Sequence, residues 1–153
     1  MKEKTNRAKV TVANYVRAES DHMFRANMKA FGVKIGGMAH VRQPTTPDNQ
    51  PVIRMNQDTL YSGTVLDLSR PVKLTLPEVG GRYMSMHVVN QDHYMFVESK
   101  PGTYELSEEK VGTRFELVTV RTFVDILDPD DLAKAHAAQD AIALTGGGDG
   151  PFE

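Results

Sequence analysis

The feature that most limits the fold of this sequence is a series of short, strand-like segments that follow one another without an intervening helix. Each segment is rich in β-branched or aromatic residues and is bounded by turn-forming residues. The expected strands are residues 52–56, 60–68, 72–76, 82–89, 94–97, 103–106 and 115–124, with a short strand at 40–43 before them. Because parallel strands need crossover connections, which are usually helical, this order predicts an antiparallel sandwich or barrel and a mainly β fold class.

One helix is expected on each side of the β region. The N-terminal helix spans roughly residues 14–31, ends at Gly32, and carries an apolar stripe at helical spacing. The stripe is formed by Val16, Met23, Phe24, Met28 and Phe31. The C-terminal helix is expected to begin with Asp128 as its N-cap and to continue to about Leu144.

The chain of 153 residues has the length of one domain. We expect a polar tail over residues 1–10 and a single β-sandwich domain with its flanking helices over residues 11–145. A flexible, glycine-rich end is expected over residues 146–153, where the chain is either complete or truncated.

Composition excludes several classes of site and partner. Without cysteine the chain has no disulfide, no thiolate nucleophile and no cysteine-based zinc site, and we expect no metal and no cofactor. A formal charge of −2 gives no reason to expect a nucleic-acid partner, and no apolar run approaches the ~20 residues of a membrane span. Residues 1–10 are too polar for a signal peptide, so the localisation is unknown: cytoplasmic as numbered, or exported if an upstream signal was removed.

A polar run from Arg54 to Tyr61 lies between two strand-like stretches. A small domain places this many hydrogen-bonding groups beside its core only if they pair with one another or with a ligand. In an extended conformation Arg54, Asn56 and Asp58 would point to one side. Arg54 could then pair with Asp58 after a bend, or with a carboxylate of a ligand, and both interpretations stay open.

A second polar cluster, from Asn90 to Tyr94, follows the expected strand at residues 82–89. In that strand Met84, Met86 and Val88 share a core face, whereas Tyr83, Ser85 and His87 share a face that meets either solvent or a pocket mouth. His87 and His93 would lie ~20 Å apart in a continuous strand, too far to share one metal ion.

The candidate catalytic residues are His93, Tyr61 and Tyr83. A histidine has a pKa suited to a general base, and a tyrosine can donate a proton. These residue types are compatible with β-elimination from a uronate or with hydrolysis, and they leave open whether the protein is an enzyme.

The two clusters carry a resemblance to a known family. The stretches at residues 52–62, 80–86 and 88–94 are similar to signatures of the bacterial domain-of-unknown-function family 1254, and further similarity extends over nearly the whole chain after about Val10. The matching motif residues are Arg54, Asn56, Asp58, Thr59, Tyr61, Arg82 and Tyr83.

The resemblance implies an immunoglobulin-like antiparallel β-sandwich with an N-terminal and a C-terminal flanking helix. It also implies that a second β-domain follows in many relatives, so that a second β-domain or a homo-oligomer is an expected partner. It implies no general activity.

Three hypotheses follow for the function. The first is a domain that binds, or acts on, a small polar or carboxylate-bearing ligand. Its expected ligand-binding residues are Arg54, Asn56, Asp58, Thr59, Tyr61, Arg82, Tyr83, Asn90, Asp92 and His93. The second is a non-catalytic structural or assembly domain whose motif is an internal hydrogen-bond network. The third is a lyase or hydrolase that acts on acidic sugars.

Overall fold

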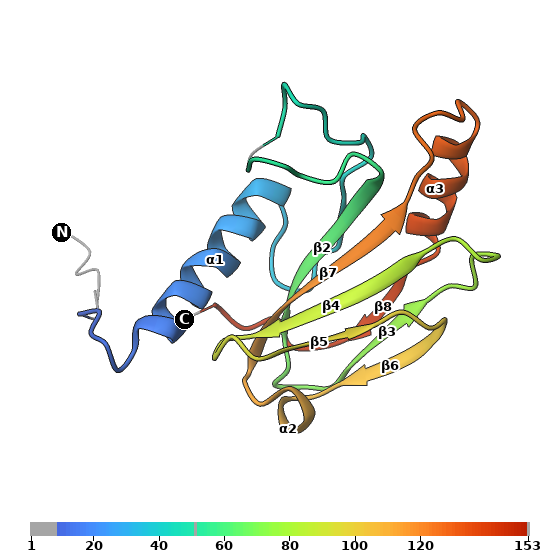
Figure 1. Cartoon of the computed structure of the whole chain (residues 1–153). Coiled ribbons are helices and arrows are strands. Elements are labelled where there is room, and N and C mark those ends of the chain that lie inside the picture. The colour runs from blue at the N-terminus through green and yellow to red at the C-terminus, as the bar shows by residue number, and fades with distance from the viewer. Residues whose placement is uncertain (1–8, 51, 153) are drawn as a thin grey trace.

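Two antiparallel sheets form the centre of the protein in the computed structural model, which describes residues 9–50 and 52–152 (Figure 1). The five-stranded sheet has the order β1 (Ala39–His40), β2 (Thr59–Asp67), β7 (Phe115–Phe123), β4 (Met84–Asn90) and β5 (Met95–Glu98). The three-stranded sheet has the order β6 (Gly102–Leu106), β3 (Val72–Leu76) and β8 (Ala143–Gly146). The described residues also form the helices α1 (Tyr15–Phe31), α2 (Glu108–Val111) and α3 (Asp131–Asp140). The expected mainly β class with antiparallel strands is confirmed.

The main core lies between the two sheets. Side chains from β2, β4 and β7 meet side chains from β3 and β6, and most of them are fully buried. The buried residues of this core are Leu66, Leu68, Val72, Leu74, Leu76, Met84, Met86, Val88, Leu106, Val111, Val118, Val120 and Ala138. The expected inward alternation of β3 and the expected core face of β4 are therefore both confirmed.

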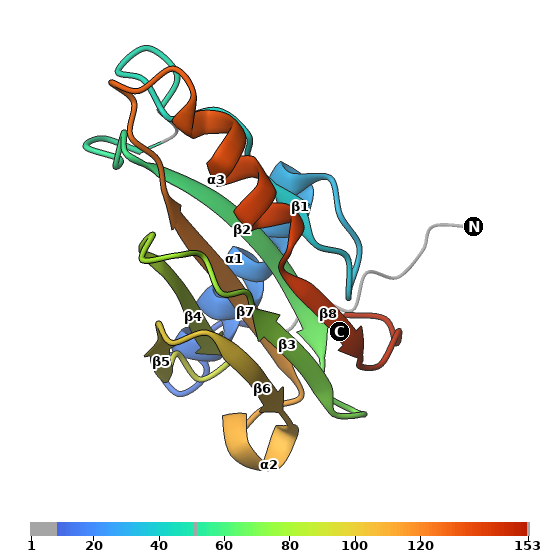
Figure 2. The same ribbon diagram turned by 90° about the vertical axis from the view of Figure 1, so that its right-hand side faces the viewer.

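Helix α1 packs on the other side of the five-stranded sheet, behind it in the view of Figure 2. Phe24 is the fully buried centre of this contact and packs against Val65 of β2 and Leu117 of β7. The helix can approach β2 closely because position 63 is glycine: a Cβ at Gly63 would lie 2.4 Å from the ring of Phe31. Of the expected stripe, Val16 is 51% exposed and does not join this contact.

A buried carboxylate fixes the C-terminal segment beside α1. Asp67, at the end of β2, accepts hydrogen bonds from the Arg114 side chain at 2.9 and 3.0 Å and from the backbone N–H of Gly150 at 3.2 Å. The segment then places Phe152 against Phe115, with ring centroids 4.8 Å apart in an edge-to-face arrangement. Helix α1 and this segment together cover the end of the sheet at which β2 finishes and β7 begins.

Two expected elements differ from the structure. Residues 52–56 form no strand: the backbone turns there, with φ +64° at Arg54, and the Gln50 side chain accepts a hydrogen bond from the Arg54 N–H at 3.0 Å. The C-terminal helix begins at Asp131 rather than near Asp128 and ends at Asp140. Residues 143–146 pair with β3 as β8, which gives that edge of β3 a partner. Of these residues, Ala143 and Leu144 had been placed at the end of the helix and Gly146 in the glycine-rich end. The sequence analysis did not predict α2, which Ser107 caps through its side chain.

The core contains one acid without a hydrogen-bond partner. Glu116 of β7 is fully buried beside Leu66 and Asn90, and neither of its carboxyl oxygens has a partner among the described residues. Burial disfavours the charged form and raises the pKa of Glu116 to about 8. The side chain is therefore mostly protonated at neutral pH.

We expect Glu116→Gln to abolish the loss of folding stability that the wild type undergoes when buried Glu116 loses its proton at rising pH. The folded pKa of about 8 lies above the ordinary value of 4.5, so the folded state binds more protons than the unfolded state between these values. The stability contributed by protonated Glu116 is complete below about pH 4.5 and is lost as the pH rises to about 8. At about 1.4 kcal/mol per pKa unit, the loss is on the order of a few kcal/mol.

Urea unfolding at several pH values checks this expectation. Between about pH 4.5 and 8 the unfolding free energy of Glu116→Gln should increase relative to that of the wild type. Above about pH 8 the difference should stay constant. Glu109→Gln, at an exposed position of α2, is the control and should show no such trend. A constant difference for Glu116→Gln across the range would show that Glu116 does not bind the proton.

Candidate functional site

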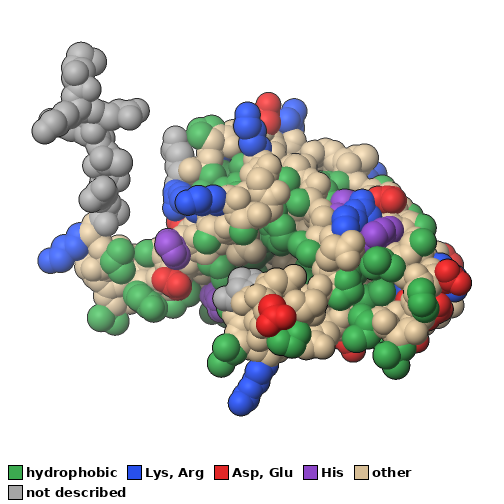
Figure 3. All heavy atoms as spheres, turned by 90° about the horizontal axis from the view of Figure 1, so that it is seen from above, with side chains coloured by type: hydrophobic (Ala, Val, Ile, Leu, Met, Phe, Trp, Pro, Cys, Tyr) green, Lys and Arg blue, Asp and Glu red, His purple; other side chains and the backbone are tan. Residues whose placement is uncertain are grey.

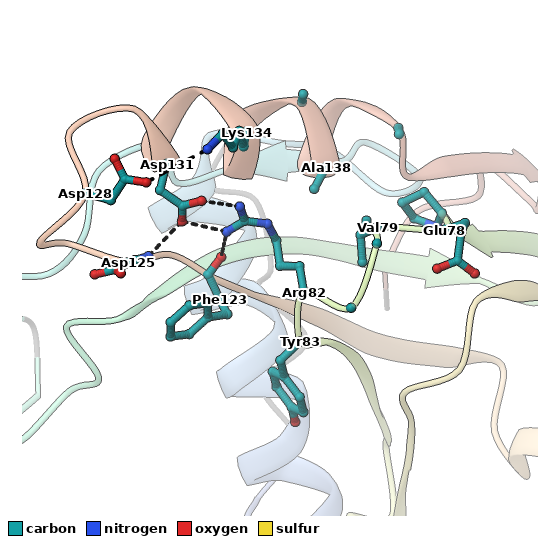
Figure 4. Close-up of a pocket in the computed structure, with 15 residues that line it drawn as sticks. Glu78, Val79, Arg82, Tyr83, Phe123, Asp125, Asp128, Asp131, Lys134 and Ala138 are labelled. Atoms are coloured by element: carbon teal, nitrogen blue, oxygen red, sulfur yellow. Dashed lines mark hydrogen bonds and ion pairs between the residues drawn. The ribbon is translucent and has the colours of Figure 1, made fainter.

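An open cleft of about 910 Å³ lies between the loop of residues 77–83, which joins β3 to β4, and helix α3 (Figure 4). It is lined by Pro77, Glu78, Val79, Gly80, Gly81, Arg82, Tyr83, Phe123, Asp125, Asp128, Asp131, Lys134, Ala137, Ala138 and Ala141. The loop turns sharply at Gly80 and Gly81, whose φ values of +60° and +86° are readily adopted only by glycine. This turn directs Arg82 towards α3.

Arg82 and Asp131 form a bidentate ion pair at the base of the cleft, and Figure 4 shows the two side chains pointing towards each other. The guanidinium donates to both carboxyl oxygens of Asp131, with 2.8 Å between Nη1 and Oδ2, and Nη1 also donates to the carbonyl of Phe123 at 2.6 Å. The Asp131 carboxylate accepts a further bond from the Asp125 N–H at 2.8 Å. The hydrogen bonds from Arg82 hold the pKa of Asp131 well below its usual range. The pair ties the β3–β4 loop to α3, and its polar groups are satisfied internally.

The rest of the cleft combines a polar rim with an apolar wall. Glu78, Asp125 and Asp128 contribute carboxylates, and the Lys134 ammonium lies 3.9 Å from the Asp128 carboxylate. The wall is formed by small or apolar side chains, among them Pro77, Val79, Ala137 and Ala141. Figure 3 shows acidic and hydrophobic side chains side by side at the end of the molecule where α3 lies in Figure 1. Such a surface can accept hydrogen bonds from hydroxyl or amino groups.

The first predicted cluster lies apart from the lining of this cleft. Arg54, Asn56 and Asp58 are exposed on the loop before β2, and the Asp58 carboxylate accepts a hydrogen bond from the Thr59 hydroxyl at 3.1 Å. Within the described residues no ion pair joins Arg54 to Asp58, so the internal pair considered for this motif is not formed. Thr59 and Tyr61 begin β2, opposite Phe123 and Arg121 of β7.

The second predicted cluster shapes the turn between β4 and β5. Asn90 is buried, donates to the carbonyl of Val111 at 2.7 Å, and accepts from the N–H groups of Asp92 and Tyr94 at 2.9 Å. The Asp92 carboxylate pairs with Arg17 of α1. The imidazole Nδ1 of His93 lies 3.4 Å from the Ser20 hydroxyl. These contacts attach the turn to the start of α1.

The structure thus brings only Arg82 and Tyr83, of the predicted residues, to the cleft. Arg54, Asn56, Asp58, Thr59 and Tyr61 lie on the loop before β2 and on its first residues, and Asn90, Asp92 and His93 lie at the β4–β5 turn. A ligand role for these two groups stays a prediction. Among residues 9–50 and 52–152, no three His, Asp or Glu side chains lie close enough to hold a metal ion. No helix in the same part of the chain is long and apolar enough to cross a membrane.

Sequence reasoning did not identify the acids that α3 and the preceding loop bring to the cleft. Asp128 had been assigned only as the cap of a helix, and Asp131 had been given no role beyond that helix. The signal was present in the density of acids at residues 125–131, where four aspartates exceed what one helix cap requires. The pairing of Asp131 with Arg82 joins positions 49 residues apart and has no local signature.

We expect Arg82→Ala to lower the melting temperature by several degrees. The variant leaves the Asp131 carboxylate, whose side chain is only 10% exposed, without its cation. Arg17→Ala is the matched control, because the Arg17–Asp92 pair is 45% exposed on both sides and should contribute little. Calorimetry of both variants tests this, and equal small effects would show that the Arg82 pair is not structural.

We expect Arg54→Ala to leave the melting temperature almost unchanged. Arg54 is exposed and its backbone N–H, rather than its side chain, makes the hydrogen bond to Gln50. A large loss of stability in the same calorimetric comparison would mean that this side chain has a structural partner.

Comparison with known proteins adds a family and a fold. The profile of the family described as "Protein of unknown function (DUF1254)" matches residues 35–111, which is half of the chain. No curated protein matches the chain. The crystal structure of the VPA0106 protein from Vibrio parahaemolyticus is similar over 86% of this chain, with a TM-score of 0.67 and 17% sequence identity. This chain spans 35% of the length of that protein, and at this identity the similarity shows the fold alone. The family match confirms the resemblance carried by the two polar signatures, and the chain belongs to the DUF1254 family.

Proposed function

We propose that this domain binds a small polar ligand, rich in hydroxyl or amino groups, in the cleft between residues 77–83 and α3. The observation that carries the proposal is that the family signature at residues 80–83 builds one wall of the cleft, opposite the acids of α3 and its preceding loop. Convergent polar groups beside an apolar wall are typical of small-molecule sites.

The charges of the cleft favour this class of ligand over a carboxylate. The Arg82 guanidinium is neutralised by Asp131, so it is not available for an anion. Three carboxylates, those of Glu78, Asp125 and Asp128, then remain against the one ammonium of Lys134. A carboxylate ligand would be repelled, whereas hydroxyl and ammonium groups can donate hydrogen bonds to these acids.

The apolar wall supports a ligand that also has a hydrophobic face. Tyr83 is 55% exposed and Phe123 is 39% exposed, and both line the cleft. The C–H groups of a sugar ring or a similar ring can pack on such aromatic and aliphatic surfaces while its hydroxyl groups reach the acids.

A structural or assembly domain is the second candidate, and the Arg82–Asp131 pair favours it. The structural hypothesis requires an internal hydrogen-bond network within the family signature. The Arg82–Asp131 pair is such a network, but it involves Arg82 and not Arg54. The hypothesis of a lyase or hydrolase for acidic sugars is less well supported at the cleft, because neither His87 nor His93 lines it. The immunoglobulin-like form of the sandwich, and a second β-domain or homo-oligomer as partner, stay predictions.

Ligand-induced shifts of the melting temperature test the proposal. The probes are methyl glucoside, glucosamine and glucuronate, which differ mainly in carrying a neutral, a cationic or an anionic group. A ligand at 100 times its dissociation constant stabilises the folded state by about 2.7 kcal/mol. We expect glucosamine and methyl glucoside to stabilise the wild type through the cleft.

Two substitutions on α3 provide the matched comparison. Ala137→Phe places a ring in the cleft and should abolish the shift, whereas Ala133→Phe makes the same change at an exposed position of α3 that does not line it. An absence of any shift in the wild type, or an equal shift in both variants, would contradict the proposal and favour the structural candidate.

A further inference from the structure

The outer face of the five-stranded sheet has a polar end that α1 does not cover. In Figure 1, α1 lies at the left, and β7 and β4 continue to the right beyond it. In this region Tyr61 of β2, Arg121 of β7 and Ser85 of β4 are directly opposite one another across three neighbouring strands. Arg121 is four residues from Leu117, which packs on the α1 side of the sheet. Residues an even number of positions apart on a strand point to the same side, so this row lies on the face that α1 partly covers.

Arg121 is the centre of this row and is exposed. No hydrogen bond or ion pair joins its side chain to another residue within 9–50 and 52–152. The carboxylates of Asp92, at the β4–β5 turn, and of Asp21, on α1, have other partners: Asp92 pairs with Arg17, and Asp21 accepts from the Gln91 amide at 2.8 Å. The N–H donors of the Arg121 guanidinium, on a central strand, therefore have no carboxylate partner among the described residues.

The next row of the sheet places an imidazole beside this end. His87 of β4 lies opposite Thr119 of β7, two positions along from the Ser85–Arg121 pair and therefore on the same face. Partial burial, the positive charge of Arg121 and that of His93 lower the pKa of His87, so Arg121 is close enough to act on the imidazole. The His87 Nε2 lies 3.4 Å from the Met95 sulfur, a weak acceptor that leaves this nitrogen largely available.

We propose that Arg121, with Tyr61 and Ser85 on either side, forms a second site that binds the carboxylate group of a small ligand. The guanidinium presents paired N–H donors in the geometry that a carboxylate accepts. Tyr61 is half-buried on one side of Arg121, and its hydroxyl can donate to a ligand oxygen. Ser85 is only 2% exposed and closes the other side, and His87 lines the side of the site towards β5. None of these four residues lines the acidic cleft, although Tyr83 and Phe123 of the cleft lie two positions away, and the site has the opposite charge preference.

Backbone amide chemical shifts under titration with glucuronate test this proposal, with methyl glucoside as the uncharged probe. We expect glucuronate to shift the amides of residues 85–87 and 119–122, and methyl glucoside to leave them unchanged. Loss of a charge-assisted pair should raise the dissociation constant at least about tenfold in Arg121→Gln, which corresponds to about 1.4 kcal/mol. Arg121→Lys should bind with intermediate strength, because it keeps the charge without the paired donors.

Two controls separate this site from a general charge effect and from the cleft. Lys73→Gln removes the same charge from an exposed position of β3 and should bind glucuronate as the wild type does. Ala137→Phe, which fills the cleft, should also leave glucuronate binding unchanged. The proposal is overturned if glucuronate shifts no amides of these strands, or if Arg121→Gln and Lys73→Gln bind it equally well.

Discussion

The pairing of β7 with β2 on one side and β4 on the other is the constraint on which the rest of this structure depends. Because side chains alternate along a strand, one register assigns every residue of the three strands to the core or to the outer face. In the observed register Val118 and Val120 enter the core between the sheets, and Leu117 meets α1. A shift by one residue would bury Arg121 in that core, where the guanidinium would have no water and no carboxylate.

The same pairing divides the outer face into a covered end and an open end. At the covered end Phe24 of α1 and Phe152 pack on Phe115, and the Asp67 carboxylate holds the segment that carries Phe152. At the open end the strand positions carry polar side chains, among them Ser85 and Arg121. Beyond the covering elements Arg121 is exposed, whereas Ser85 beside it is buried.

Local patterns were sufficient for most of the strands but not for contacts between distant segments. The alternation at residues 72–76 predicted β3 with its observed bounds, and the apolar stripe predicted α1 to within one residue. Residues 52–56 were predicted as a strand because Val52 and Ile53 are β-branched, yet the Gln50 side chain stabilises a turn there. Ala143 and Leu144 of β8 were included in the expected helix because this short apolar run has no period of its own. The pairing of β8 with β3 joins positions far apart in the sequence.

The candidate site residues show the same limit. A signature string identifies residues that the family uses, but it does not distinguish a ligand contact from a structural one. Asn90 is buried and satisfied by the backbone of its own turn and of Val111, and Arg82 is satisfied by Asp131. Neither role follows from residue type, since an asparagine and an arginine serve equally well in a binding site.

The family signatures therefore shape the two proposed sites through the positions they fix. The glycines and Arg82 of residues 80–83 hold the loop against α3, which brings the acids of the cleft to one surface. The alternating residues that follow in β4 place Ser85 beside Arg121 on the outer face of the sheet, two positions along from Tyr83 and Phe123 of the cleft. One strand thus connects an acidic cleft at its start with a basic row on its outer face. The two surfaces have opposite charge. A ligand with a carboxylate at one end and an ammonium group or several hydroxyls at the other would therefore bind in one orientation, with its carboxylate at Arg121.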